Sequence, residues 1–458
     1  MNDSLKTWAW RTLVTAAIIV VLGACFYTEE NARGLRAWQK CEREITARGE
    51  SLDWNAYVPA PVPDDQNFYK APLMAGWFVR NATNTSPSSL GSGNPETTVN
   101  DITELFASNY LAWSAAFESD YQAIRDAVKR PAARMDGDYS RPYFQPVPNF
   151  VNYRLVSQVM AHRAKCHLLL GAPGQALDDL TLLHGLNLTL VKPGNPHLLV
   201  GAMIHTAIAA LYADAIACGM EAHAWREPEL AALQKQLAEI NLLSVVAGAF
   251  RHDRAGVCHL LEVSSVDELM RVARNNTNFI TSDLGWWFVP SGWIYQNKAV
   301  IATLEGNVIA SLDFTNQTVS PYKTLAAGRA AEENFRHVTP WNYIAAITVP
   351  NFSKATITMA RNQTWVDQAR IACALERFRF ANGKYPDTLA ALVPQFLDKI
   401  PHDIISGKPM SYTRTDEQNF KLYSVGWNEV DDGGITAHTG DGREDRDFGD
   451  WVWHYPAL

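Results

Sequence analysis

The sequence lacks most of the features that identify a disulfide-stabilised secreted domain or a familiar enzyme. It has only six cysteines in 458 residues, and none of them forms a CxxC pair. One, Cys25, lies in the apolar N-terminal stretch, which leaves an odd number for the rest of the chain. This pattern argues against a disulfide framework and indicates that most cysteines are small apolar core residues. The motifs G-x-S-x-G and H-E-x-x-H, the P-loop and the Rossmann glycine motif are also missing.

An excess of positive charge is missing as well. The chain has 40 basic side chains against 48 acidic ones, a formal net charge of -8. A protein that binds nucleic acid needs a basic face to neutralise phosphates, so nucleic acid is excluded as a partner. No sustained heptad repeat is present, which excludes a coiled-coil rod. What the chain does have is 47% hydrophobic residues, typical of packed globular proteins.

The first distinctive feature is an apolar segment from Leu13 to Tyr27. Lys6 and Arg11 precede it, and Glu29 and Glu30 follow it. Positive residues before an apolar segment and acidic residues after it predict a cytoplasmic N-terminus and an exported body. We therefore predict a transmembrane helix, through which the membrane is a partner of this chain.

Three interpretations of this segment stay open. Residues 1–30 form a retained single-pass anchor in a bacterial inner membrane if the helix continues into the charged residues that follow, which contain no Pro or Gly-rich spacer. The short apolar run also fits a cleaved signal peptide. Leu22-Gly23-Ala24-Cys25 resembles a lipobox, which would make the chain a lipoprotein anchored at Cys25. We predict the retained anchor, and all three interpretations place the body outside the cytoplasm.

Two regions follow the anchor. Residues 31–150 contain a charged helix and then a Pro-rich extended linker region. Residues 151–340 are predicted to form an α-helical body, because apolar residues recur at intervals of three and four. Leu198 to Met220 is apolar enough to suggest a second membrane span, but His205 and Asp214 interrupt it and favour a buried bundle helix.

Two details of the helical body bear on its function. Leu168 to Leu180 resembles one tetratricopeptide hairpin with its turn at Gly171, but no second copy follows at the spacing of such repeats. An irregular helical bundle is therefore predicted. Cys166-His167 and Cys258-His259 suggest metal ligands, but neighbours in a helix point about 100° apart and one pair cannot easily chelate one ion. The aromatic loop from Trp286 to Tyr295 is either a binding platform or a cover packed on the bundle.

Residues 341–458 differ in character and are predicted to form a small C-terminal α+β head. A long helix ends at Asn382-Gly383, where glycine suits the helix C-terminus. A short helix follows around Leu389 and Leu392. Strands are predicted at Met410–Arg414 and Phe420–Val425, and the residues around Trp451 are predicted to form a terminal strand. The predicted fold class is thus mainly α, with this small head after the bundle.

An ordered set of short motifs gives this region a resemblance to a known family. The motifs are Ala374-Leu375, Gly383-Lys384-Tyr385-Pro386, Pro401-His402-Asp403, Gly407-Lys408-Pro409, Tyr412 and Ser424-Val425-Gly426. In this order they resemble the globular head of type II secretion major pseudopilins. The whole chain resembles uncharacterised bacterial membrane-anchored proteins that end in such a head. No prepilin peptidase site and no long apolar polymerisation helix precede the motifs, so filament assembly is not expected.

The acidic residues are concentrated in one glycine-rich loop, from Asn428 to Asp450. Eight acids and two arginines give it a charge of -6, out of -8 for the whole chain. Calcium prefers six to eight oxygen ligands in flexible loops, and an exported compartment can supply it. The corresponding loop of major pseudopilins binds calcium, so the resemblance implies a site formed by Asn428, Asp431, Asp432 and Asp450. The alternative is a solvated acidic loop without an ion.

Two functions follow from these observations. The first is a non-enzymatic, membrane-anchored envelope protein that acts in scaffolding or protein interaction, with an envelope protein as its partner and a link to a secretion or pilus-like system. The second is an exported hydrolase or carbohydrate-binding enzyme. A deep pocket that joins two carboxylates to tryptophan side chains would favour the second function. A closed helical body with only a surface acidic loop would favour the first.

Overall fold

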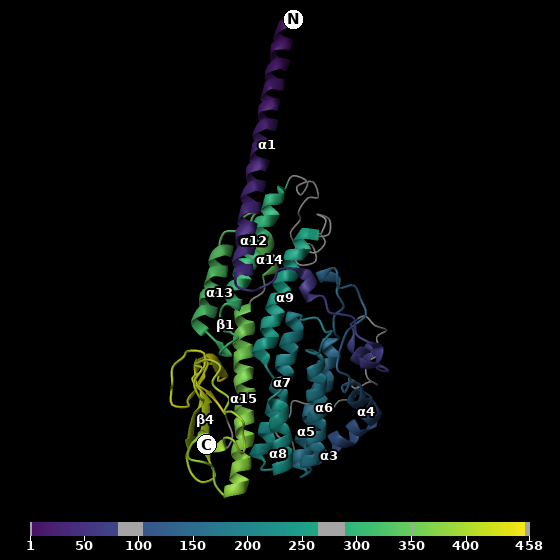
Figure 1. Cartoon of the computed structure of the whole chain (residues 1–458), viewed down its shortest axis with the longest axis vertical. Coiled ribbons are helices and arrows are strands. Elements are labelled where there is room, and N and C mark those ends of the chain that lie inside the picture. Colours follow the sequence, from purple (N-terminus) through teal and green to yellow (C-terminus); the bar gives the residue numbers. More distant parts are fainter. Residues whose placement is uncertain (1, 81–103, 264–288, 350–351, 454–458) are drawn as a thin grey trace. The chain divides into compact units, whose positions relative to one another are not determined.

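A computed structural model describes residues 2–80, 104–263, 289–349 and 352–453 (Figure 1). The chain divides into two compact units, each drawn from three segments. Unit 1 comprises Met1–Ala56, Arg254–Val308 and Ala326–Asn351, and unit 2 comprises Tyr57–Asp253, Ile309–Leu325 and Phe352–Leu458. The aromatic residues from Trp286 to Phe288 lie outside the described residues.

The N-terminal helix α1 (Asn2–Ala47) is a single helix of 46 residues. Its apolar part is exposed, with Trp8 at 69% and Val20 at 69% of their accessible surface. The second half is different, because Trp38, Cys41 and Ile45 are buried. The unbroken continuation of the apolar segment into the charged residues agrees with the sequence prediction. The N-terminal helix is long and apolar enough to cross a membrane, a test that a signal sequence also passes.

Unit 1 packs the second half of α1 against α12 (Ser291–Ile309) and the last part of α9 (Leu242–Val263). Helices α13 (Pro321–Phe335) and α14 (Tyr343–Thr348) are the other described helices of the segments that contribute to it. The two cations that are buried among the described residues of this unit are compensated. Arg254 pairs with Glu50 at 2.5 Å, and the Lys298 ammonium lies 4.0 Å from the centroid of the Trp38 ring.

The backbones of α1 and α12 touch at two glycines. A Cβ atom on Gly34 would lie 2.0 Å from the carbonyl oxygen of Gly292, and one on Gly292 would lie 2.0 Å from the carbonyl oxygen of Glu30. Polar contacts surround this crossing. The Gly292 N–H donates to Asn31 Oδ1 at 2.9 Å, and Trp293 Nε1 donates to Glu30 Oε2 at 2.9 Å. The second half of α1 is therefore part of the folded unit.

Unit 2 is mainly helical. Its described helices, beside the first part of α9, are α2 (Met74–Phe78), α3 (Glu104–Ser114), α4 (Glu118–Ala127), α5 (Phe150–Leu169), α6 (Pro173–Thr189), α7 (Leu199–Glu221), α8 (Glu227–Leu237) and α15 (Phe352–Asn382). Short 3-10 helices of this unit occur at Asp64–Gln66, Phe68–Lys70, Ala115–Phe117, Pro142–Phe144 and Leu389–Leu392. Another, Trp54–Tyr57, lies where the chain passes from unit 1 to unit 2. Helix α5 packs on α3, α6 and α7, and α15 packs on α7 and α8.

Two predictions for this bundle are confirmed. Helices α5 and α6 form the predicted hairpin, with Gly171 at the turn in a left-handed conformation of φ 72° and Ala176 fully buried at the helix contact. Helix α7 is long and apolar enough to cross a membrane, but 56% of its apolar window is buried inside the unit. This burial agrees with the prediction of a bundle helix.

The C-terminal part of unit 2 combines α15 with small antiparallel sheets (Figure 1). Strands β3 (Ser411–Arg414), β4 (Phe420–Ser424) and β7 (Trp451–Val452) form one sheet in the order β3-β4-β7, and β5 (Thr436–His438) pairs with β6 (Glu444–Gly449). A further pair, β1 (Leu312–Asp313) and β2 (Thr318–Val319), lies earlier in the chain. The predicted helix end, short helix and three strands are all present.

Candidate functional site

The structure brings two of the four predicted calcium ligands into direct contact. Asn428 Nδ2 donates to Asp432 Oδ2 at 3.3 Å. Asp431 has other partners: its Oδ1 accepts hydrogen bonds from the Tyr423 hydroxyl and the Gly433 N–H, both at 3.0 Å. These three side chains therefore lie on one turn after β4, as the spacing of the residues requires.

Asp450 returns to the same turn from the far end of the acidic loop. Its Oδ2 accepts a hydrogen bond from the Gly434 N–H at 2.6 Å, and its N–H donates to the carbonyl of Ile435 at 2.9 Å. The side chain is only 1% exposed, and its Oδ1 is buried without a hydrogen-bond partner among the described residues. Burial raises the pKa of this carboxyl, and the nearby Asp431 carboxylate raises it further.

The donors at this turn suit calcium in chemistry, because they are oxygen atoms and Asp450 Oδ1 is unpaired. Within the described ranges, however, no three His, Cys, Asp or Glu side chains gather closely enough to hold a metal ion. Amide and carbonyl oxygens would therefore have to supply part of the coordination. The Cys-His pairs offer no site either, because the His259 ring stacks on Trp54 and His167 lies 3.6 Å from Asp179.

A pocket of about 330 Å³ opens between α7, α15 and the β6–β7 segment. Tryptophan and carboxylate side chains meet in its wall: Trp365 and Trp451 together with Asp214 and Glu444. The rest of the wall is mainly apolar, with small residues of α7 such as Ala207. We call this the tryptophan pocket.

Both carboxylates of the tryptophan pocket carry a cationic partner. Asp214 Oδ2 lies 2.6 Å from Lys165 Nζ, and Glu444 pairs with Arg361. Two contacts fix the tryptophan side chains of the wall. The Trp365 and Trp453 rings pack with centroids 4.5 Å apart, and Gln368 Nε2 donates a hydrogen bond to the carbonyl of Trp451. Neutralised carboxylates beside a tryptophan face suit the binding of a polar ligand with apolar faces better than bond cleavage by two free acids.

Sequence reasoning missed the tryptophan pocket. The available signal was the spacing of Arg361, Trp365 and Gln368, which recur at intervals of four and three and so share one face of α15. In the sequence, Asp214 is only a charge that interrupts an apolar helix. Its partner Lys165 comes from α5, and no local pattern in the sequence connects the two.

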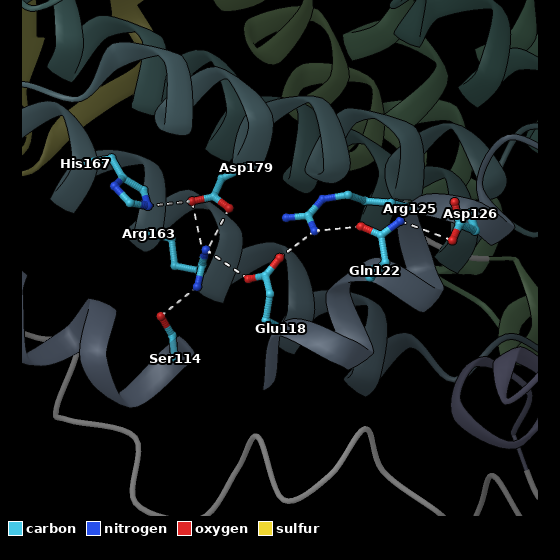
Figure 2. A network of polar contacts seen from close by, with 8 residues as sticks. All are labelled: Ser114, Glu118, Gln122, Arg125, Asp126, Arg163, His167 and Asp179. Carbon is cyan, nitrogen blue, oxygen red and sulfur yellow. Dashed lines mark hydrogen bonds and ion pairs between the residues drawn. The ribbon is translucent and has the colours of Figure 1, made fainter. Parts of the chain in front are cut away.

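A second concentration of charge is buried between α3, α4, α5 and α6 (Figure 2). The Arg163 guanidinium donates through Nε to both oxygens of Asp179, at 3.1 and 3.2 Å, and through Nη1 to the Ser114 hydroxyl at 2.9 Å. Its Nη2 lies 3.5 Å from Glu118 Oε2, and Glu118 also pairs with Arg125 at 2.6 Å.

This network joins four helices, and its central Arg163–Asp179 pair is nearly closed to solvent. Asp179 is 1% exposed, and burial raises its pKa to about 6 despite the opposing charge of Arg163. Burial also lowers the pKa of His167. A perturbed carboxyl can mark a functional site, but Asp179 does not line the tryptophan pocket. The network is best understood as a polar tie that fixes the positions of these helices.

The described part of the aromatic loop is packed. Trp293 and Tyr295 begin α12, where Trp293 donates to Glu30 and Tyr295 packs beside the cluster around Trp38. The cysteines also agree with prediction, since the six described thiols are free and Cys41, Cys166, Cys258 and Cys373 are buried.

Comparison of the chain with protein-family models, curated proteins and solved structures finds no match. The function proposed below is therefore argued from the geometry of the described residues.

Proposed function

We propose that this chain is a non-enzymatic envelope protein, held in a bacterial inner membrane by a single N-terminal helix, with its N-terminus in the cytoplasm and its body exported. Its role is scaffolding or interaction with another envelope protein, in connection with a secretion or pilus-like system. The observation that carries the proposal is the division of α1 into an exposed apolar half and a half that belongs to unit 1.

The continuity of α1 favours a retained anchor over a cleaved signal. Helical structure runs through Cys25 without interruption, and the body begins to bury this helix at Glu30, which is 8% exposed. The apolar half has many large exposed side chains, which a bilayer would cover. The intact mass of protein extracted from membranes tests this directly. We expect a chain that begins at Met1 or Asn2 without lipid on Cys25, and a truncated, lipidated chain would contradict the anchor.

An interaction role is supported by exposed apolar side chains on the acidic loop. Ile435 is 64% exposed, Phe448 63% and Val430 52%, and carboxylates surround them in the sequence. Exposed apolar side chains mark a contact with another protein when they form one contiguous patch. We expect a photo-crosslinking amino acid at Phe448 to form a discrete adduct in intact cells, and the same group at the exposed Thr413 of β3 to form none. Absence of an adduct at Phe448 would count against this surface.

The pseudopilin-like head and its calcium ion belong to this proposal. Calcium would be held by Asp431 and Asp450, with Asn428 and Asp432 on the same turn, and it would neutralise the buried Asp450 carboxyl. An ion that binds only the folded chain raises its melting temperature. We therefore expect millimolar calcium to raise the melting temperature of the full chain, and Asp450→Asn to abolish that rise. Asp441→Asn, at an exposed position of the same loop, is the matched control. No rise in the unaltered chain would contradict the site.

One observation favours the second function, carbohydrate binding. The tryptophan pocket joins an aromatic wall to Asp214 and Glu444, the combination named above as its signature. Sugars pack their apolar faces on tryptophan rings and hydrogen-bond to carboxylates at the rim. Soluble oligosaccharides should then change the tryptophan fluorescence saturably, and Trp365→Ala should remove the response while Trp113→Ala retains it. Release of new reducing ends, lost in Glu444→Gln, would instead support a hydrolase.

A further inference from the structure

A second pocket lies on another face of α15, in unit 2. It has a volume of about 240 Å³ and is lined by Asp367 and Arg370 of α15 and by Lys399 and His402 of the segment before β3. Gln363 also lines it from α15, and residues from the end of α8 to the start of α9, such as Ile240 and Leu243, line it as well. We call it the arginine pocket.

The sequence of α15 explains why two pockets can share this helix. Gln363, Asp367 and Arg370 recur at intervals of four and three, as the residues of the tryptophan pocket do, but two positions further along the chain. Two positions in a helix correspond to a rotation of about 200°, so the two sets project to opposite sides. The arginine pocket is thus separate from the site discussed above.

The amide and imidazole groups of the arginine pocket already have partners. Gln363 Oε1 accepts from the Leu242 N–H at 2.8 Å, and its Nε2 donates to Asp367 Oδ2 at 3.1 Å. His402 Nε2 lies 3.1 Å from the carbonyl of Gln317, which can only accept, so this nitrogen carries the proton. These bonds fix the wall of the pocket.

The cations of the pocket are not satisfied in this way. Arg370 and Lys399 form no ion pair with another part of the chain that the structure describes, and Arg370 Nε is buried without a hydrogen-bond partner there. A buried guanidinium nitrogen without a partner is costly, and a planar anion that accepts two parallel hydrogen bonds is its natural complement. The one carboxyl of the pocket, Asp367, is held by Gln363 instead.

We propose that the arginine pocket binds the oxyanion group of a ligand, a carboxylate or a phosphate-type group, with Arg370 as the principal donor and the exposed Lys399 at the mouth. The volume fits a small group rather than an extended chain. This site lies outside the acidic loop and the tryptophan pocket, so the proposal of anion binding does not depend on the function proposed above.

Asp367 makes this binding sensitive to pH. Burial raises the pKa of its carboxyl to about 7, and the nearby Asp403 carboxylate adds to the effect while Arg370 opposes it. Below pH 7 the carboxyl is mainly neutral and the charge of the pocket comes from Arg370 and Lys399, with His402 in the wall. Above pH 7 it ionises and competes with the bound anion for Arg370.

Equilibrium dialysis of the full chain in detergent, with labelled sulfate or acetate at constant ionic strength, tests the proposal at pH 6 and pH 8. Neither probe changes its charge between these values, so a pH effect belongs to the protein. We expect one saturable site per chain, with weaker binding at pH 8. Arg370→Gln should weaken binding by about tenfold to a hundredfold, the usual contribution of a charged hydrogen bond. Lys384→Gln, at an exposed position beyond the end of α15, should bind as the unaltered chain does.

Asp367→Asn provides a second test that does not depend on the folding of the arginine variant. Because asparagine keeps the shape of the neutral carboxyl, this variant should bind equally at both pH values. Preference for sulfate would assign a phosphate-type ligand, and preference for acetate a carboxylate. Lack of saturable binding of either probe, or equal binding by the unaltered chain and Arg370→Gln, would overturn the site. Binding by Asp367→Asn that still falls at pH 8 would overturn the role given to Asp367.

Discussion

The contact between α1 and α12 gives the sharpest prediction for the anchor. Gly34→Ala would place a Cβ atom 2.0 Å from the carbonyl oxygen of Gly292, whereas real Cβ contacts essentially never fall below 3.0 Å. The obstacle is backbone, which cannot rotate away as a side chain can. The two helices must therefore separate, and the hydrogen bond from the Gly292 N–H to Asn31 weakens with them.

The size of the effect follows from two opposing terms. Overpacking of a tight contact costs about 1–3 kcal/mol, and contact with backbone belongs at the upper end. Replacing glycine by alanine inside a helix returns up to about 1 kcal/mol. We expect the docked state of α1 to lose about 2 kcal/mol, which is roughly a thirtyfold change in the docking equilibrium.

Cys41 reports this equilibrium because it is 7% exposed and packs in the cluster that holds α1 on unit 1. Alkylation of its thiol in the full chain in detergent, followed by mass spectrometry of the Cys41 peptide, should be roughly thirtyfold faster in Gly34→Ala when opening is rapid. Gly23→Ala is the matched control on the same helix, since a Cβ there meets nothing within 4 Å. Equal alkylation rates in Gly34→Ala and the unaltered chain would refute the reasoning.

Three further predictions concern unit 2. Asp179→Ala should lower the free energy of unfolding by about 3–5 kcal/mol, because it leaves Arg163 buried without its main acceptor. The double variant Arg163→Met/Asp179→Leu should be more stable in urea than Asp179→Ala, and the reverse order would contradict a polar tie. Burial lowers the pKa of His205 to about 4, so the folded chain binds fewer protons than the unfolded one. Protonation of the unfolded chain therefore lowers the free energy of unfolding as the pH falls from about 6.5 towards 4. His205→Gln should therefore reduce the loss of melting temperature between pH 7 and pH 5, and an unchanged loss would exclude His205 as its source. Tyr153→Phe removes the hydroxyl that contacts Tyr69 at 3.1 Å, and should cost about 1–3 kcal/mol in a urea titration; no measurable loss would show that this buried contact contributes little.

Local patterns were enough to predict most helices and the C-terminal strands. The end of α15 depends on Asn382-Gly383, and Gly383 has a φ of 79°, which the sequence signals directly. The α5–α6 hairpin likewise depends on Gly171. The assembly of unit 1 was not predictable, because α1 meets α12 across 258 positions between Gly34 and Gly292 and no local pattern records such a contact.

The candidate sites divide in the same way. The acidic loop could be found because its charges lie close together in the sequence, and Asp450 accepts a hydrogen bond from Gly434 in the same loop. The tryptophan pocket could not, because its carboxylates come from α7 and β6 and their neutralising partners from two other positions. Arg370 had no signal at all, since a guanidinium nitrogen that is buried without a hydrogen-bond partner can be recognised only when every neighbour is known.

The unbroken course of α1 has a mechanical consequence. A helix without a hinge transmits rotation, so the angular direction of each residue near Val20 is locked to that of Gly34, which the contact with α12 fixes. Insertion of one residue between Phe26 and Glu30 would turn the apolar half by about 100° and shift it by about 1.5 Å relative to unit 1. A rotation or tilt of the apolar half would therefore move the docked half of α1 with it, as one rigid helix.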